Sequence, residues 1–176
     1  HDLGFVDYVE NLTADQQEAI FSSKLLYILP WRAVWNTNSI STPCRPVFDG
    51  SHPTKTGLSL NDLLAKGKNT MNKLLEVVIR WLIRRCAYHT DLQNMYNRVL
   101  LEQEHWCYQL YYFHNELDPN LEPKLKVIKT LIYGIKSSGN QAEKGLRETA
   151  NLQNEQYPRQ YEVVSTEVYV DDCLSG

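Results

Sequence analysis

Apolar residues recur along the chain with two different periods, which predicts both helices and strands. A spacing of three and four residues predicts helices over residues 69–85 and 138–154. Shorter helices are expected where a hydroxyl side chain can cap the free backbone N–H groups of a first turn. These capped helices begin at Thr13, with Gln16 as the capping-box partner, and at Ser59.

Runs of β-branched and aromatic residues predict the strands. The predicted strands cover residues 27–35, 44–49, 86–91, 106–114, 126–133 and 161–170. Pro30 makes the first of them an edge strand, because proline cannot donate to a sheet ladder. We expect a buried strand over 86–91 and a turn over 118–120. Because helices and strands are mixed rather than strictly alternating, the expected fold class is α+β.

Carboxylates follow two of these predicted strands. Asp91 ends the strand over 86–91, and Asp171 and Asp172 follow the last strand. We expect Asp171 to end that strand beside Asp91, with Asp172 next to it on the hairpin turn. If the two strands are neighbours in one sheet, the three carboxylates converge. Adjacent negative charges repel one another unless a cation lies between them, so a divalent-ion site is one interpretation. The other is a β-turn, in which aspartate is common because its side chain bonds nearby backbone.

The composition is that of a folded globular protein. Of the 176 residues, 43% are hydrophobic and 22% are charged, so we expect one domain, or one domain with a smaller lobe. The net charge of −3 gives no general electrostatic reason to bind nucleic acid. The longest apolar run, over 74–83, is interrupted by Glu76 and Arg80 and is too short to span a bilayer. Because the chain begins at His1, we expect it to be a segment of a longer protein.

Four cysteines lie far apart in the sequence, and no two of them form a Cys-x-x-Cys pair. The sequence His105-Trp106-Cys107 also lacks the spacing of zinc ligands. We therefore expect reduced thiols of an intracellular protein, with neither a disulfide nor a zinc site. The cysteines are Cys44, Cys86, Cys107 and Cys173.

Five motifs follow one another in the chain. They are Arg45-Pro-Val-Phe-Asp-Gly-Ser51, Gly57-Leu-Ser-Leu-Asn-Asp-Leu-Leu64, Thr90-Asp-Leu-Gln-Asn-Met-Tyr96, Tyr133-Gly-Ile-Lys-Ser-Ser-Gly-Asn-Gln-Ala142 and Tyr169-Val-Asp-Asp-Cys-Leu-Ser-Gly176. With these motifs in this order, the chain resembles the reverse transcriptase of BEL/Pao-type LTR retrotransposons from residue 27 to the end. The resemblance implies an RNA-directed DNA polymerase with the fingers and palm of a right-hand polymerase, in which helices back an antiparallel palm sheet.

The resemblance also implies roles for the carboxylates. Asp91 and Asp171 would bridge two Mg²⁺ ions, with Mn²⁺ as an alternative, and Asp172 would shape the site or bind one ion transiently. Such ions lower the pKa of the attacking primer 3′-hydroxyl and neutralise the leaving pyrophosphate. Mg²⁺ favours few carboxylates together with phosphate oxygens and waters. Taken alone, Asp91 is also consistent with the cap of a strand end.

Four further residues are implied in binding the incoming deoxynucleoside triphosphate. Tyr96 would lie under the sugar, where its ring excludes a 2′-hydroxyl; a core tyrosine is the alternative. Arg45 would grip the triphosphate, a role suited to a guanidinium, although the lysine that commonly accompanies it is absent from residues 35–40. Gly134 would allow close backbone approach, and Lys136 would reach a phosphate or remain solvated.

The resemblance places Gln141 and Tyr169 at the template and primer. It divides the chain into an acidic helical lead-in (1–26), a fingers-like region (27–85) and a palm (86–176). The implied partners are an RNA or DNA template-primer, a deoxynucleoside triphosphate and the thumb, RNase H, integrase and protease regions of a Pol polyprotein, with no membrane. The implied location is intracellular, in cytoplasmic retrotransposon particles.

Other functions stay open from the sequence. An inactive remnant or domesticated fragment would bind nucleic acid or protein without catalysis, but retention of all three carboxylates favours the enzyme. An RRM-like RNA-binding module would need stacking aromatics on its central strands and no acidic triad. Without a thumb and primer grip, the 176 residues alone are expected to bind primer-template weakly and to be inactive. The final hairpin is expected to lack its following strand, which would leave a sheet edge unpaired.

Overall fold

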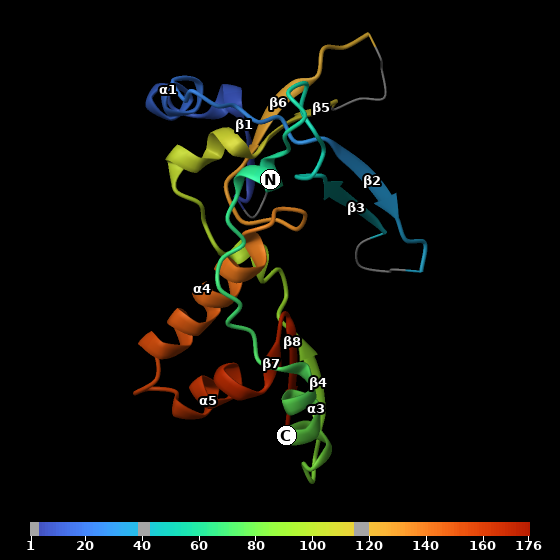
Figure 1. Cartoon of the computed structure of the whole chain (residues 1–176), viewed down its shortest axis with the longest axis vertical. Helices are drawn as coiled ribbons and strands as arrows, with labels where there is room; N and C mark the ends of the chain where they lie inside the picture. Colours follow the sequence, from blue (N-terminus) through green and yellow to red (C-terminus); the bar gives the residue numbers. More distant parts are fainter. Residues whose placement is uncertain (1–3, 39–42, 115–119) are drawn as a thin grey trace. The chain divides into compact units, whose positions relative to one another are not determined.

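The computed structural model has a mixed α+β architecture with antiparallel sheets, which confirms the predicted fold class. The described residues are 4–38, 43–114 and 120–176. They form two compact units, and Figure 1 labels the strands and most of the α-helices. None of the described helices is long and apolar enough to cross a membrane.

Unit 1 is built from residues within 1–65 and 100–136 and contains a three-stranded sheet in the order β1–β6–β5. Ile20, Leu110 and Val127 are completely buried in the core between this sheet and α1. The helices and strands of this region are β1 (Val6–Tyr8), the 3₁₀ helix Val9–Asn11, α1 (Ala14–Phe21), the 3₁₀ helix Gln103–Tyr108, β5 (Leu110–Phe113) and β6 (Lys124–Ile128).

The start of α1 has the predicted capping box. The Thr13 hydroxyl accepts a hydrogen bond from the backbone N–H of Gln16, and the Gln16 side chain accepts one from the backbone of Thr13. Ser59 caps the short helix α2 (Leu60–Leu63) in the same way, with Asp62 as its partner. Both capping predictions are therefore confirmed.

Unit 1 also carries a two-stranded antiparallel ribbon of β2 (Trp31–Trp35) and β3 (Cys44–Phe48). Most of its side chains are exposed. The Trp31 ring stacks on Phe113 with a centroid distance of 5.6 Å, so the base of the ribbon packs on the three-stranded sheet of the same unit.

Unit 2 is built from residues 66–99 and 137–176, and its antiparallel sheet has the order β4–β8–β7. Two of its helices, α3 and α5, contact β7 and β8, and α4 contacts α5 (Figure 1). The helices and strands of this unit are α3 (Leu74–Leu82), β4 (Tyr88–Asp91), the 3₁₀ helix Tyr96–Arg98, α4 (Ser138–Leu152), α5 (Pro158–Thr166), β7 (Val168–Tyr169) and β8 (Asp172–Ser175).

Several predicted strands are shorter than expected, or wrong. Most of 161–170 is the helix α5, in which Pro158 occupies the first turn; proline fits there because its φ is helical and its missing N–H has no helical partner to lose. Residues 106–108 belong to a 3₁₀ helix whose aromatic and cysteine side chains fill the core. The strand predicted as buried over 86–91 is exposed along all of β4.

The remaining boundaries differ by a few residues. The strands predicted over 27–35 and 126–133 are confined to β2 and β6, and the helix predicted over 69–85 is confined to α3. Of the turn predicted over 118–120, Asp118 and Pro119 lie outside the described residues. All four cysteines are free thiols.

Candidate functional site

Three carboxylates converge at one end of the sheet of unit 2. Asp91 ends β4 and Asp172 begins β8, and the two residues lie directly opposite each other in the antiparallel register. Asp171 lies in the turn between β7 and β8. One carboxylate oxygen from each of the three residues lies within 4.8 Å of the other two. The convergence that the sequence predicts is therefore present.

The positions of the two adjacent aspartates are interchanged relative to the prediction. Asp171 was expected on the strand beside Asp91, with Asp172 in the turn. Tyr169 instead pairs with Asp172, so the hairpin loop consists of Val170 and Asp171. The hairpin of β7 and β8 is complete, and β8 lies at the centre of the sheet, between β4 and β7. The absence of a further strand after this hairpin stays a prediction.

The turn that presents Asp171 is conformationally strained. Val170 has a φ of 58°, which a β-branched residue rarely adopts. A two-residue hairpin loop with a positive φ at its first position normally places glycine there. Such a conformation costs on the order of 1–3 kcal/mol, so the surrounding structure must maintain it. One contact that does so is the hydrogen bond of 2.7 Å from the backbone N–H of Leu92 to the carbonyl of Asp171.

His89 adds a side chain that the sequence analysis did not identify. Its Nε2 lies 2.8 Å from Oδ1 of Asp172. His89 and Asp91 are two residues apart on β4 and therefore project from the same face of the sheet. The alternation along this strand is the sequence signal that could have identified His89 as a partner of the carboxylates.

Tyr96 lies close to the carboxylates in unit 2. It is buried in the 3₁₀ helix Tyr96–Arg98. Burial raises the pKa of Tyr96, and the negative charge of Asp171 raises it further. Its hydroxyl oxygen would lie 3.5 Å from a Cβ added at Gly139, so the phenol contacts the first turn of α4. The role of Tyr96 in sugar selection stays a prediction.

The two residues predicted to contact template and primer, Tyr169 and Gln141, also belong to unit 2. Tyr169 is half-buried in β7, opposite Asp172. Gln141 is exposed in the first part of α4, and its backbone N–H donates to the carbonyl of Ser137. Their contacts to template and primer stay predictions.

The predicted substrate residues of unit 1 lie on the ribbon and on one loop. Arg45 is exposed on β3, opposite Val34. Gly134 has a φ of 95°, and a Cβ added to it would clash with the carbonyl oxygen of Phe48. Glycine is thus required at position 134 by both the backbone conformation and the close approach of β3.

Asn61 in α2 holds the loop that contains Gly134 and Lys136. Its Nδ2 donates to the carbonyl of Gly134 at 2.9 Å, and its Oδ1 accepts from the backbone N–H of Lys136 at 2.7 Å. The Lys136 ammonium donates to the Asn61 carbonyl at 3.0 Å. Asn61 carries no local sequence signal for this role, because its partners lie more than 70 residues away in the chain.

A buried carboxylate, Glu167, holds the end of the hairpin opposite to the aspartates. Glu167 is 1% exposed; it accepts hydrogen bonds from Arg84 and from Arg159, the latter at 3.2 and 3.4 Å. Burial raises the pKa of Glu167, but the hydrogen bond from Ser175 and the charges of Arg159 and Arg84 outweigh burial and lower the pKa. The backbone N–H of Leu174 donates to the carbonyl of Glu167 at 2.9 Å.

No protein-family model matches the chain, and no curated protein matches it in sequence. The functional assignment therefore depends on the five motifs and on the geometry of the carboxylates.

Proposed function

We propose that this chain is the fingers and palm of an RNA-directed DNA polymerase of the BEL/Pao retrotransposon type. The observation that carries the proposal is the group of Asp91, Asp171 and Asp172, whose carboxylate oxygens lie within 4.8 Å of one another. The sheet of unit 2 would be the palm, and the ribbon of β2 and β3 would belong to the fingers.

The donor set fits two Mg²⁺ ions, or Mn²⁺ in their place. All three side chains offer hard oxygen ligands, and Asp91 and Asp172 are exposed, so water and phosphate oxygens can complete the coordination. Three negative charges at this separation repel one another, which favours cation binding. When bound, the ions would lower the pKa of the primer 3′-hydroxyl and neutralise the leaving pyrophosphate.

The chain's own residues would hold and orient the reactants. Asp91 and Asp171 would hold the ions, and His89 would orient Asp172 through its hydrogen bond of 2.8 Å. Tyr96 lies near Asp171, whose negative charge raises the pKa of Tyr96. The Tyr96 ring would exclude a ribose 2′-hydroxyl. Arg45 would bind the triphosphate as a charge-assisted donor. The partners would be a template-primer and the remaining regions of the Pol polyprotein.

Primer extension on an RNA template by the full-length protein that carries this region tests the proposal. Asp91→Asn and Asp171→Asn should each reduce the rate by at least about 10²–10³-fold, because transition-state charge loses its stabilisation. Asp172→Asn should be milder, and Asp15→Asn, at an exposed position of α1, should leave the rate unchanged. Extension by the Asp91→Asn/Asp171→Asn double variant at the wild-type rate would rule the proposal out.

A further inference from the structure

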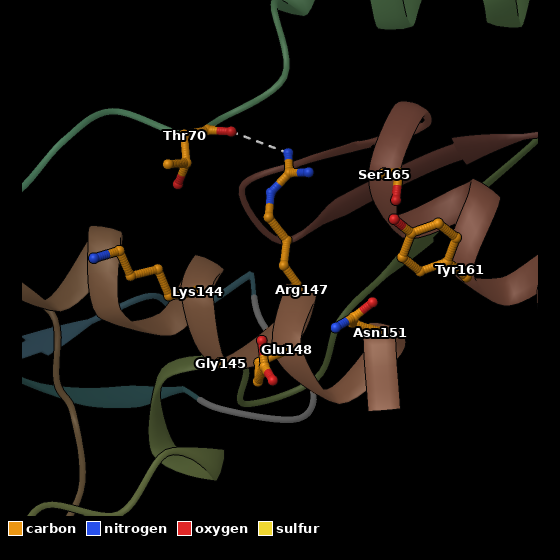
Figure 2. Close-up of a pocket in the computed structure, with 8 residues that line it drawn as sticks. All are labelled: Thr70, Lys144, Gly145, Arg147, Glu148, Asn151, Tyr161 and Ser165. Atoms are coloured by element: carbon orange, nitrogen blue, oxygen red, sulfur yellow. Dashed lines mark hydrogen bonds between the residues drawn. The ribbon is translucent and has the colours of Figure 1, made fainter. Parts of the chain in front are cut away.

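A second site lies within unit 2, away from the aspartates. It is an open pocket of about 590 Å³ formed by α4, α5 and the segment around Thr70 (Figure 2). Its volume is in the range of small-molecule sites. Neither Asp91, Asp171 nor Asp172 lines it.

Arg147, in the wall of this pocket, is held in a fixed orientation. Its Nε donates to Glu143 at 2.9 Å, and its Nη2 donates to the carbonyl of Thr70 and to Oδ1 of Asn72, each at 3.0 Å. Within the described part of the chain, its Nη1 makes no hydrogen bond. Figure 2 shows this remaining nitrogen on the side of the pocket where Tyr161 and Ser165 lie.

Several of the other polar groups of the pocket can donate hydrogen bonds. Tyr161 and Ser165 lie one turn apart on α5, and Figure 2 shows both on the same side of the pocket. Asn151 and Lys144, both exposed on α4, contribute an amide and an ammonium group. A pre-oriented guanidinium with hydroxyl, amide and ammonium donors around it is suited to a phosphate group.

The remaining features favour a nucleotide over inorganic phosphate. The pocket is several times larger than a phosphate ion, and the Tyr161 ring offers a surface on which a base can stack. Glu148 also lines the pocket and forms no ion pair with Lys144, although the two lie one turn apart on α4. Its carboxylate can accept hydrogen bonds from sugar hydroxyls or from the amino group of a base.

We propose that this pocket binds the phosphate group of a nucleotide, either free or within a single strand. Arg147 Nη1, Tyr161 and Ser165 bind the phosphate, and Lys144, which Figure 2 shows on the other side of Arg147, contributes a nearby positive charge. Glu148 and the Tyr161 ring contact the nucleoside. The site goes beyond the proposed polymerase reaction and requires no divalent ion.

Calorimetric titration of the 176-residue chain in EDTA tests this site with four probes. The probes are deoxyadenosine monophosphate, adenosine, inorganic phosphate and a short oligodeoxyadenylate. The monophosphate should bind at least about tenfold more tightly than adenosine, because the charge-assisted bonds are lost without the phosphate. Binding of the oligonucleotide alone would identify a strand as the source of the phosphate, and binding of the monophosphate would identify a free nucleotide; both outcomes support the site.

The Tyr161→Phe/Ser165→Ala double variant removes only two hydroxyl groups, so the fold should be retained. It should weaken nucleotide binding about tenfold, and Lys144→Gln should weaken it several-fold. Lys55→Gln, at an exposed position of unit 1, is the charge-matched control and should have no effect. Failure of every phosphate-bearing probe to bind, or unchanged binding by the first two variants, would overturn the site. Because EDTA removes divalent ions, this result is independent of the polymerase proposal.

Discussion

Replacing Glu167 with glutamine removes the negative charge between Arg84 and Arg159 while keeping the size of the side chain. We expect this change to loosen the end of the β7–β8 hairpin. Glu167 is the residue before β7, and its carbonyl accepts a hydrogen bond from Leu174 in β8. A weaker ion cluster should therefore be detected as faster opening of β8.

The magnitude follows from the exposure of the three side chains. Breaking a buried ion pair by removing one partner costs about 3–5 kcal/mol. The side chains of Arg84 and Arg159 are 34% and 45% exposed, so water solvates the released charges and reduces the cost to about 2–3 kcal/mol. Amide hydrogen exchange in β8 should therefore accelerate by about 30- to 150-fold, since each 1.4 kcal/mol is a factor of ten.

Hydrogen exchange of the Cys173, Leu174 and Ser175 amides at pH 7 is the assay. Glu162→Gln is the matched control, because Glu162 pairs with the same Arg159 at 3.0 Å but has a side chain that is 60% exposed. An exposed pair contributes about 0–1 kcal/mol, so the control should change exchange less than about fivefold. Equal effects of the two substitutions would refute the reasoning.

The ion cluster around Glu167 makes the stability of the protein depend on pH in a definite direction. The pKa of Glu167 is lower in the folded protein than in the unfolded chain. Its stabilisation is therefore complete above the unfolded pKa and is lost as the pH falls through the lowered folded pKa. The difference in stability between wild type and Glu167→Gln should shrink in acid, and a difference that persists to strongly acidic pH would contradict this assignment.

Three further substitutions test other parts of the account. In urea unfolding, Gly134→Ala should lower the stability of unit 1 more than Gly57→Ala does. Both positions have a positive φ, but only at position 134 would a Cβ clash with backbone. Equal losses of stability would contradict this. Thr13→Ala should lower the free energy of unfolding by about 1 kcal/mol, and no loss would show that the Thr13 cap does not stabilise the fold. Tyr96→Ala should increase ribonucleotide incorporation in primer extension, whereas Tyr96→Phe should not; an unchanged preference would make Tyr96 a core residue only.

Elements with local signals were predictable from the sequence. The capping boxes at Thr13 and Ser59 and the long helix α4 depend on residues within a few positions of one another. The helix α5 was missed because residues 161–170 were predicted as a strand, although Pro158 just before them can begin a helix. The exposure of β4 depends on whether distant segments pack over it, and no local sequence pattern indicates such packing.

The candidate site was predictable in outline but not in detail. Carboxylates at the ends of paired strands predicted the convergence of Asp91 with Asp171 and Asp172. The one-position interchange arises because the hairpin loop is Val170-Asp171, and valine gives no local signal for a positive φ. His89, Asn61 and Glu167 were missed because their partners lie far along the chain or in another element.

Binding of Mn²⁺ to the 176-residue chain, measured by electron paramagnetic resonance with Mg²⁺ as competitor, tests the central claim most directly. The account predicts that Mn²⁺ binds, that Mg²⁺ displaces it, and that Asp91→Asn and Asp171→Asn each weaken binding at least about tenfold, since each removes a charged ligand. Asp15→Asn should bind Mn²⁺ as the wild type does. Mn²⁺ binding of equal strength in the wild type and in the Asp91→Asn/Asp171→Asn double variant would contradict the claim.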